Sequence, residues 1–296
     1  MQPMRYKIFL IFLLFKTMGW TQTNNDPLYV NFGYFSKAAI KDVEVKTPLL
    51  YMDFGLVLPE WKLSERTKFH LQLNFKHFAY DFEPEISENQ NFTDARMGFI
   101  VRHHFSEKYE LLFLPRLHLR TNFEEEWEKR SLFPSFSAIL LHHAPANPDL
   151  TYGAGLSLNN DLNRNSILPL GYLSYKSDKL RVNAIVPVYV YITLLSQNKK
   201  LEYGLATNFD AQILNFSNEG ATYLKTRNIL IGPTFSYNPA GKLWINFKSG
   251  VSLFRNFEWL DKDFESFMTY ESQYFQARQL DPAFFAIGGL SWRLGE

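Results

Sequence analysis

Two neighbouring segments of the chain carry enough ionisable side chains to build a charged patch. Both segments, 93–105 and 109–121, alternate polar and apolar residues, and only Ser106, Glu107 and Lys108 separate them. A link this short predicts a hairpin, which determines the residues that lie opposite each other. It pairs Asp94 with Arg120, Arg96 with His118 and Gly98 with Arg116, and leaves Arg102 on the same face. The candidate site residues, called the charged set below, are Asp94, Arg96, Arg102, Arg116, His118 and Arg120.

The charged set has more positive than negative groups, and this excess indicates affinity for anions. Rings of Arg and Lys line anion-selective pores, so the set can attract a small solute with carboxylate or phosphate groups. The alternative is a structural wall, whose charges are neutralised by acids of other strands or by the Glu-rich loop 124–128 folded inward. A narrow interior must neutralise its charges. The structural wall is therefore favoured, and the anion site stays open as a second interpretation.

Two histidine pairs, His103–His104 and His142–His143, suggest metal ligands. Adjacent residues of a strand point to opposite faces, so the two members of one pair cannot hold the same ion. We expect these histidines near strand ends or in turns. The sequence predicts no metal site and no cofactor.

Two serines, Ser137 and Ser157, fall on the polar side of their segments, where a histidine-activated serine could act as a nucleophile. Neither lies in a nucleophile elbow. The glycines at 153–155 and 288–289 lie within alternating segments, where they indicate close packing or a bend rather than a phosphate-binding loop. We therefore expect no catalytic residue and no enzyme, with a membrane lipid hydrolase as a weaker alternative.

Extended strands must position these residues, because polar and apolar residues alternate with a period of two. In 68–80 the two faces consist of Phe69, Leu71, Leu73 and Phe75 on one side, and His70, Gln72, Asn74 and Lys76 on the other. This alternation is typical of a strand with one apolar face. Similar segments occur at 28–37, 47–58, 67–80, 93–105, 109–121, 132–142, 149–159, 166–176, 179–187, 188–195, 200–214, 221–236, 241–254 and 281–294. Several are long enough to cross a bilayer when tilted.

The links between these segments alternate between short and long, as in transmembrane barrels with short periplasmic turns and long external loops. The tract 179–195 breaks this alternation when read as one strand. Splitting it at Pro187, which cannot donate a ladder hydrogen bond, restores the alternation and gives fourteen strands. Twelve strands remain the alternative. The longest link is predicted to be a loop at 255–280.

Composition places the chain in a membrane rather than on nucleic acid. The formal net charge is only +1, which argues against nucleic acid as a partner, and aromatic residues make up 17% of the chain. The chain has no cysteine, so no disulfide or thiolate site is available. Residues 1–22 contain Arg5 and Lys7 before an apolar run, as in a secretory signal peptide, and 23–296 then form one domain.

The tract 151–205 carries a resemblance to a known family. Its features are Tyr152–Gly155, Leu168–Gly171, the Ser177–Asp178 turn, Pro187 and Leu201–Gly204, with GGLSWRL near the end of the chain. These residues resemble an uncharacterised family of outer-membrane β-barrel proteins of Gram-negative bacteria, classified as a domain of unknown function. The resemblance implies location and fold and no activity. Outer-membrane barrels commonly end on an aromatic residue that assists assembly, whereas this chain ends Arg293–Glu296, with Trp292 as the candidate substitute.

The sequence thus predicts an all-β, single-domain, antiparallel up-and-down transmembrane β-barrel, with fourteen strands preferred, in the outer membrane of a Gram-negative bacterium. The expected function is a passive or weakly selective pore or transporter for small solutes. The alternative is a structural or interaction barrel that binds a surface partner through its long external loops. Expected partners are outer-membrane lipid, lipopolysaccharide, the barrel assembly machinery and a small anionic solute, with the charged set lining the lumen.

Overall fold

The computed structural model describes residues 26–39, 46–80, 91–122, 131–159, 166–215, 223–260, 278–279 and 281–293. Within these ranges, no helix is long and apolar enough to cross a membrane. The predicted signal peptide at 1–22 lies outside the described residues, as does most of the predicted loop at 255–280.

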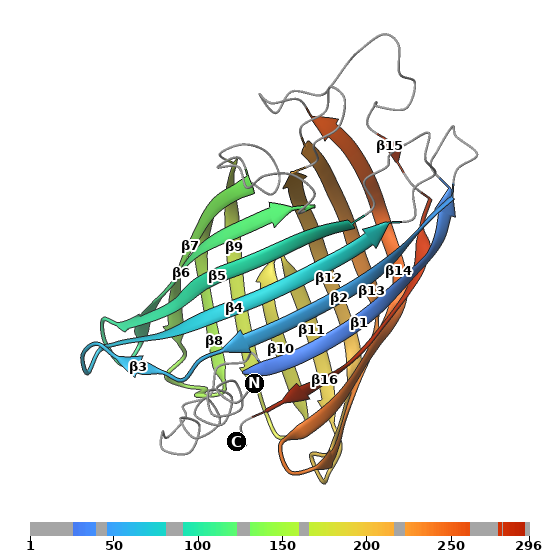
Figure 1. Ribbon diagram of the computed structural model, residues 1–296. Coiled ribbons are helices and arrows are strands. Elements are labelled where there is room, and N and C mark those ends of the chain that lie inside the picture. The colour runs from blue at the N-terminus through green and yellow to red at the C-terminus, as the bar shows by residue number, and fades with distance from the viewer. Residues whose placement is uncertain are drawn as a thin grey trace, which may run out of the picture.

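The described residues form fourteen long strands and two strands of two residues, all paired in antiparallel fashion (Figure 1). The long strands are β1 (Leu28–Ala39), β2 (Lys46–Val57), β4 (Thr67–Tyr80), β5 (Asn91–His104), β6 (Tyr109–Thr121), β7 (Leu132–His143), β8 (Leu150–Asn159), β9 (Ser166–Lys176), β10 (Leu180–Val186), β11 (Tyr189–Leu195), β12 (Leu201–Asn215), β13 (Tyr223–Ala240), β14 (Leu243–Leu260) and β16 (Ala283–Trp292). The short strands are β3 (Trp61–Lys62), which pairs with β4, and β15 (Arg278–Gln279), which pairs with β14.

The sheet closes on itself into a barrel. Each long strand pairs with the next along the chain, and β1 pairs with both β2 and β16. Closure gives every long strand of the described wall a partner on both sides over most of its length. The preferred count of fourteen strands is confirmed, and so is the division at Pro187, because β10 and β11 form a separate hairpin with Ile185 opposite Tyr189.

The apolar face of the strands points out of the barrel, as predicted. In β4, Leu73 is 36% exposed whereas the adjacent Asn74 is 4% exposed. The same holds around the ring, and exposed large apolar side chains include Phe32, Leu50, Met97, Leu117, Leu140, Leu156, Ile167, Ile192, Leu205, Ile231, Phe247 and Leu290. Water-accessible apolar surface on this scale on every side of a barrel is typical of contact with lipid.

The two ends of the barrel differ in the length of their links. The short-turn end holds both described chain ends, Asp26 and Arg293, and links such as 105–108 and 241–242 (Figure 1). The opposite end, called the long-link end, holds the links from β4 to β5 and from β14 to β16. The Pro187–Val188 turn is the exception to the predicted alternation, because it is short and lies at the long-link end.

One predicted boundary is wrong, since β14 continues to Leu260 through residues expected to begin the long loop. The pairing of β13 with β14 shifts register between Arg227 and Ile229, and Phe254 on β14 has a φ of 52°. A bulge of this kind inserts one residue and exchanges the two faces of the strand beyond it. The alternation on which the prediction depended therefore loses its phase at Phe254.

The wall is lowest at β10 and β11, which have seven residues each. The pairing of β12 with β11 stops at Asn208, whereas its pairing with β13 continues to Asn215. We call this low part of the wall the β10–β11 notch. Beyond it, β12 lies across the interior against β5 and β6.

Close backbone packing is required where β8 passes between β7 and β9. The inward-facing residues of β8 there include Gly153 and Gly155, and β7 and β9 approach each other over them. A Cβ added to Gly155 would lie 2.7 Å from the Cα of Ile139 and would also collide with the carbonyl oxygen of Ala138. Backbone atoms of the wall cannot rotate away as a flexible side chain can.

We therefore expect Gly155→Ala to lower the free energy of unfolding by about 1–3 kcal/mol, the usual cost of forcing extra volume into a packed site. Gly171→Ala is the matched control, since a Cβ at Gly171 meets no atom within 4 Å. Urea titration of the barrel folded in lipid vesicles measures both. Equal stability of the two variants would contradict the packing of β7, β8 and β9 given above.

Candidate functional site in the barrel interior

The charged set lies on the inner face of β5 and β6, in the predicted register. Asp94 is opposite Arg120, Arg96 opposite His118 and Gly98 opposite Arg116. The hairpin link 105–108 and the closed wall thus position all six side chains on one face. The anion-binding role predicted for them depends on whether their positive charges are free.

Asp94, His118 and Arg120 form a compact network that neutralises its own charge. The Nε of Arg120 lies 3.4 Å from Asp94 Oδ2, and Nδ1 of His118 lies 3.1 Å from Asp94 Oδ1. Arg120 Nη2 donates to His118 Nδ1 at 3.0 Å. All three side chains are buried. A buried carboxylate is stable only with such partners, so this network supports the structural-wall interpretation.

Arg102 is neutralised separately, toward the short-turn end. Its Nη1 donates to Glu110 Oε1 at 2.9 Å. Arg96 and Arg116 lie on the inner face between Arg102 and the Asp94 network and are partly buried. Arg102 and Arg120 therefore each lie beside a carboxylate, and the charged set is not one exposed cationic wall.

Ser135, His118 and Asp94 lie in the order of a serine-hydrolase triad, which was missed because Ser137 and Ser157 were the serines considered. Ser135 Oγ lies 3.4 Å from His118 Nε2. A hydrolase would need a hydrogen on His118 Nδ1 and a free lone pair on Nε2. His118 Nδ1 lies 3.1 Å from Asp94 Oδ1, which can only accept a hydrogen bond, and 3.0 Å from Arg120 Nη2, which can only donate one. These two contacts favour opposite tautomers of His118, so the weaker hydrolase alternative stays a prediction.

The two serines considered from the sequence bond to each other. Ser137 Oγ donates to Ser157 Oγ at 2.8 Å, and Ser157 Oγ donates to the Phe136 carbonyl oxygen at 3.5 Å. Both serines are buried on the inner face. These contacts satisfy the two hydroxyl groups as structural side chains.

Buried apolar side chains pack together in the interior toward the long-link end, where strict alternation would place polar residues on the inner face. The members of this apolar layer are Phe35, Leu49, Phe78, Tyr80, Phe92, Leu214, Leu224, Leu230, Ala283 and Phe285. They come from β1, β2, β4, β5, β12, β13 and β16. Lys248 lies next to this apolar layer. Its Nζ is 5.7 Å from the centre of the Phe285 ring and donates a hydrogen bond to Asn208 Oδ1.

Side chains from opposite sides of the barrel also contact each other across the interior. Phe133 of β7 packs with Ile213, Tyr223 and Leu260, which lie on β12, β13 and β14. The rings of Phe133 and Tyr223 are 6.1 Å apart in an edge-on arrangement. Asn215 Nδ2 donates to Ser131 Oγ at 2.8 Å. These side chains bridge the wall above the β10–β11 notch.

A second apolar cluster lines the other half of the ring. It contains Val57, Ile100, Leu112, Leu114, Ile139, Leu141 and Leu170, with Leu168, Tyr172 and Ile185 packed against it. Together with the apolar layer it places hydrophobic side chains on the inner face of most of the wall. The inner face of the described wall is therefore apolar over much of its area rather than uniformly polar.

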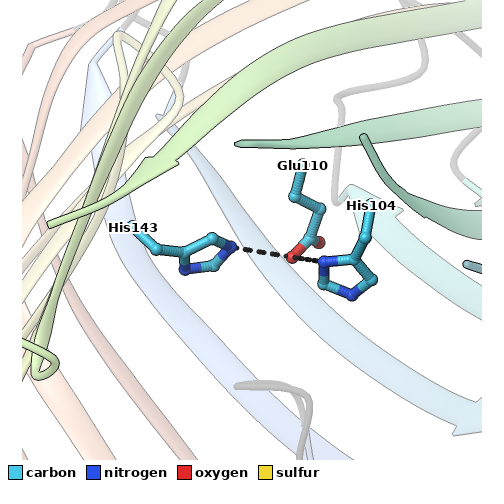
Figure 2. A group of neighbouring side chains, drawn as sticks. All are labelled: His104, Glu110 and His143. Carbon is cyan, nitrogen blue, oxygen red and sulfur yellow. Dashed lines mark hydrogen bonds and ion pairs between the residues drawn. The ribbon is translucent and has the colours of Figure 1, made fainter. Parts of the chain in front are cut away.

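The two histidine pairs meet in a way that the sequence argument missed. One member of each pair faces the interior, and His104 and His143 converge on Glu110 (Figure 2). His143 Nε2 lies 3.1 Å from Glu110 Oε2, and His104 Nδ1 lies 3.7 Å from the same oxygen. The other members face away, with His103 Nδ1 2.8 Å from Thr67 Oγ1 and the His142 ring between Tyr109 and Tyr152.

The two members of each histidine pair point to opposite faces, as predicted. Members of different pairs were not compared from the sequence, and it is these that meet at Glu110. The predicted hairpin at 106–108 also places His104 opposite Glu110, as observed. His143 lies one step beyond Leu141 on the inner face of β7, and Leu141 is opposite Glu110. The predicted register of β5 and β6 therefore contained the signal for the His104–Glu110 contact, whereas the His143–Glu110 contact depends on the observed register of β6 and β7.

A closed antiparallel barrel with an apolar outer face and ion-paired inner side chains defines the class of outer-membrane-type β-barrels. Within that class, the chain belongs to the family described as Domain of unknown function (DUF6268), whose match covers residues 58–293. This confirms the resemblance to an uncharacterised barrel family.

Solved structures share the barrel fold at low similarity. The TodX monoaromatic hydrocarbon channel deltaS2 mutant is 10% identical with a TM-score of 0.41, over 93% of this chain and 91% of that one. LpxR from Salmonella typhimurium is 6% identical with a TM-score of 0.33, over 90% of this chain and 100% of that one. A mutant of Rh. blastica porin is 8% identical with a TM-score of 0.26, over 88% and 99% of the two chains. No curated protein sequence matches the chain.

Breaking the buried Asp94 network should destabilise the barrel. Arg120→Met removes the cation and leaves a buried carboxylate without it, so we expect the free energy of unfolding to fall by about 3–5 kcal/mol. Lys199→Met is the control, because it breaks the exposed pair of Lys199 Nζ with Asp178 Oδ1, 2.8 Å apart. An exposed pair contributes little. Urea unfolding in vesicles measures both variants, and a loss at Arg120 no larger than at Lys199 would contradict a structural role for the network.

Proposed function

We propose that this protein is an integral outer-membrane barrel with a closed interior, which serves as a structural or interaction barrel rather than as a passive pore. The observation that carries the proposal is the apolar layer, together with the contacts from β12–β14 to β7 above the β10–β11 notch. Its outer face would contact outer-membrane lipid, and the long-link end would meet lipopolysaccharide. We also propose that the protein is not an enzyme.

The outer face supports placement in a membrane. Exposed apolar side chains surround the ring, and strands such as β5 and β6 have more residues than the 9–11 or so that a tilted strand needs to cross a bilayer. A soluble barrel with this outer face would expose far more apolar surface than monomeric proteins usually do.

The closed interior supports the structural role. A hydrated ion that crosses the barrel must pass Phe92, Leu214 and Phe285, whose side chains are fully buried. An ion that enters these apolar surroundings loses its hydration shell, and the free energy of that transfer is strongly unfavourable. Within the charged set, Arg120 and Arg102 are already bound by Asp94 and Glu110.

A transporter for small solutes is the second candidate function, and one observation favours it. Inner-face polar residues toward the short-turn end, among them Lys68, Arg102, Ser174 and Arg181, are only partly buried. Water therefore reaches part of the interior from that end. Transport would require the apolar layer to move aside, whereas an interaction barrel requires no such movement.

Single-channel recording separates the two candidates. We expect purified protein in planar bilayers to give no stable conductance steps, and we expect the double substitution Phe92→Ala and Phe285→Ala to produce them by thinning the apolar layer. The control replaces Phe99 and Phe284, which are exposed on the outer face, by alanine. Stable steps in the unaltered protein would overturn the closed-barrel proposal, and loss of their anion preference in Arg102→Glu or Arg116→Glu would then favour the transporter.

A charge on the outer face tests the membrane placement. Leu205 is 62% exposed on β12, and we expect Leu205→Arg to lower the free energy of unfolding in lipid vesicles by about 2–4 kcal/mol, as for arginine near the bilayer midplane. Leu63 is 69% exposed but lies in the link between β3 and β4, so Leu63→Arg should have little effect. If both substitutions are tolerated equally, the apolar outer face is not in contact with acyl chains.

A further inference from the structure

We propose that His104, Glu110 and His143 form a binding site for a divalent transition-metal ion of the zinc type, inside the barrel near the short-turn end (Figure 2). The proposal does not depend on whether the barrel conducts. Among the described residues, one donor atom from each of these three side chains lies within 4.8 Å of the donors of the other two.

The chemistry of the donors fits zinc. Two imidazoles and one carboxylate make up one of the common ligand sets of zinc sites that keep an open position. Zinc bonds to nitrogen and oxygen at about 2.0–2.2 Å, so two ligands of a tetrahedral ion lie about 3.3 Å apart. Glu110 Oε2 lies 3.1 Å from His143 Nε2 and 3.7 Å from His104 Nδ1, on either side of that value. Binding of an ion would require the donors of His104 and His143, which lie within 4.8 Å of each other, to turn toward a common centre.

Neighbouring side chains orient two of the three ligands. Thr151 Oγ1 lies 3.1 Å from His143 Nδ1, and by accepting its hydrogen it would direct the Nε2 lone pair toward Glu110. A hydrogen bond to the second ring nitrogen is the usual support of a histidine ligand. Arg102 binds Glu110 Oε1 at 2.9 Å, which fixes the carboxylate and leaves Oε2 for the ion.

The site is also accessible from water. Glu110 is 1% exposed, but the side chains of His104 and His143 are 39% and 35% exposed. Both histidines end their strands at the short-turn end, next to the links 105–108 and 144–149. An ion held here would rest on a buried carboxylate and keep one position open to the water at this mouth.

Without an ion, the same atoms form hydrogen bonds between histidine and glutamate, so measured binding must decide. The full barrel, purified in detergent and freed of metal, is titrated with Zn²⁺ against a coloured zinc chelator. We expect one ion per chain, with His104→Ala and His143→Ala each weakening binding about tenfold or more. The matched controls are His103→Ala and His142→Ala, the outward members of the same pairs, which should leave the affinity unchanged.

Replacing Zn²⁺ by Co²⁺ provides a second measurement, since a tetrahedral Co²⁺ site absorbs visible light far more strongly than hydrated Co²⁺. We expect this absorption in the unaltered barrel and its loss in His104→Ala. His104 is the more exposed ligand, so this variant retains the test if His143→Ala does not fold. The proposal is overturned if the unaltered barrel takes up no zinc at about 100 μM, or if the outward controls weaken binding as much as the inward substitutions.

Discussion

The closed ring of backbone hydrogen bonds is the constraint on which the rest of the structure depends. A strand that faces lipid cannot leave its N–H and C=O groups unpaired, so the wall must return to its starting strand. The pairing of β1 with both β2 and β16 achieves this closure. Once the ring is closed, each residue is assigned to the outer or the inner face by its parity along the strand.

Closure of the ring also encloses an interior, which the inward-facing side chains must either fill or leave to water. An interior bounded by fourteen strands is wide enough to hold water, yet this one is packed by apolar side chains and ion pairs. Polar networks such as Asp94 with His118 and Arg120 occupy positions between the apolar clusters. Asp94 and Glu110 each lie beside an arginine, whereas Asp53 is bound by Tyr51 and Asn74, so the wall buries these carboxylates with hydrogen-bonding partners.

Much of the fold could be predicted from the sequence, because outward and inward side chains alternate along each strand. Apolar and polar residues therefore alternate with a period of two. The hairpin register of β5 and β6 followed from the short link 106–108, and with it the pairing of Asp94 with Arg120. The bulge at Phe254 could not be predicted, since one inserted residue has no compositional signature. The apolar layer was missed for another reason: residues such as Phe78 continue the alternation as apolar side chains on the inner face, and their packing depends on distant strands.

Some contacts of the candidate site could be predicted from the sequence and others could not. Relations across one hairpin, such as His104 opposite Glu110, were available from counting residues. The contact of His143 with Glu110 depends on the register of β6 and β7 across a longer link, and the contact of Asn215 with Ser131 depends on the barrel shape. A single sequence specifies neither.

The β10–β11 notch has a consequence for the surrounding membrane. Seven residues at about 3.3 Å each, tilted by about 40°, rise only about 18 Å, whereas the apolar band of an outer-membrane barrel is about 25 Å tall. In an outer membrane, acyl chains beside these two strands would have to shorten or tilt to match, while those beside β13 and β14 would not. The barrel would therefore impose an uneven thickness on the lipid around it.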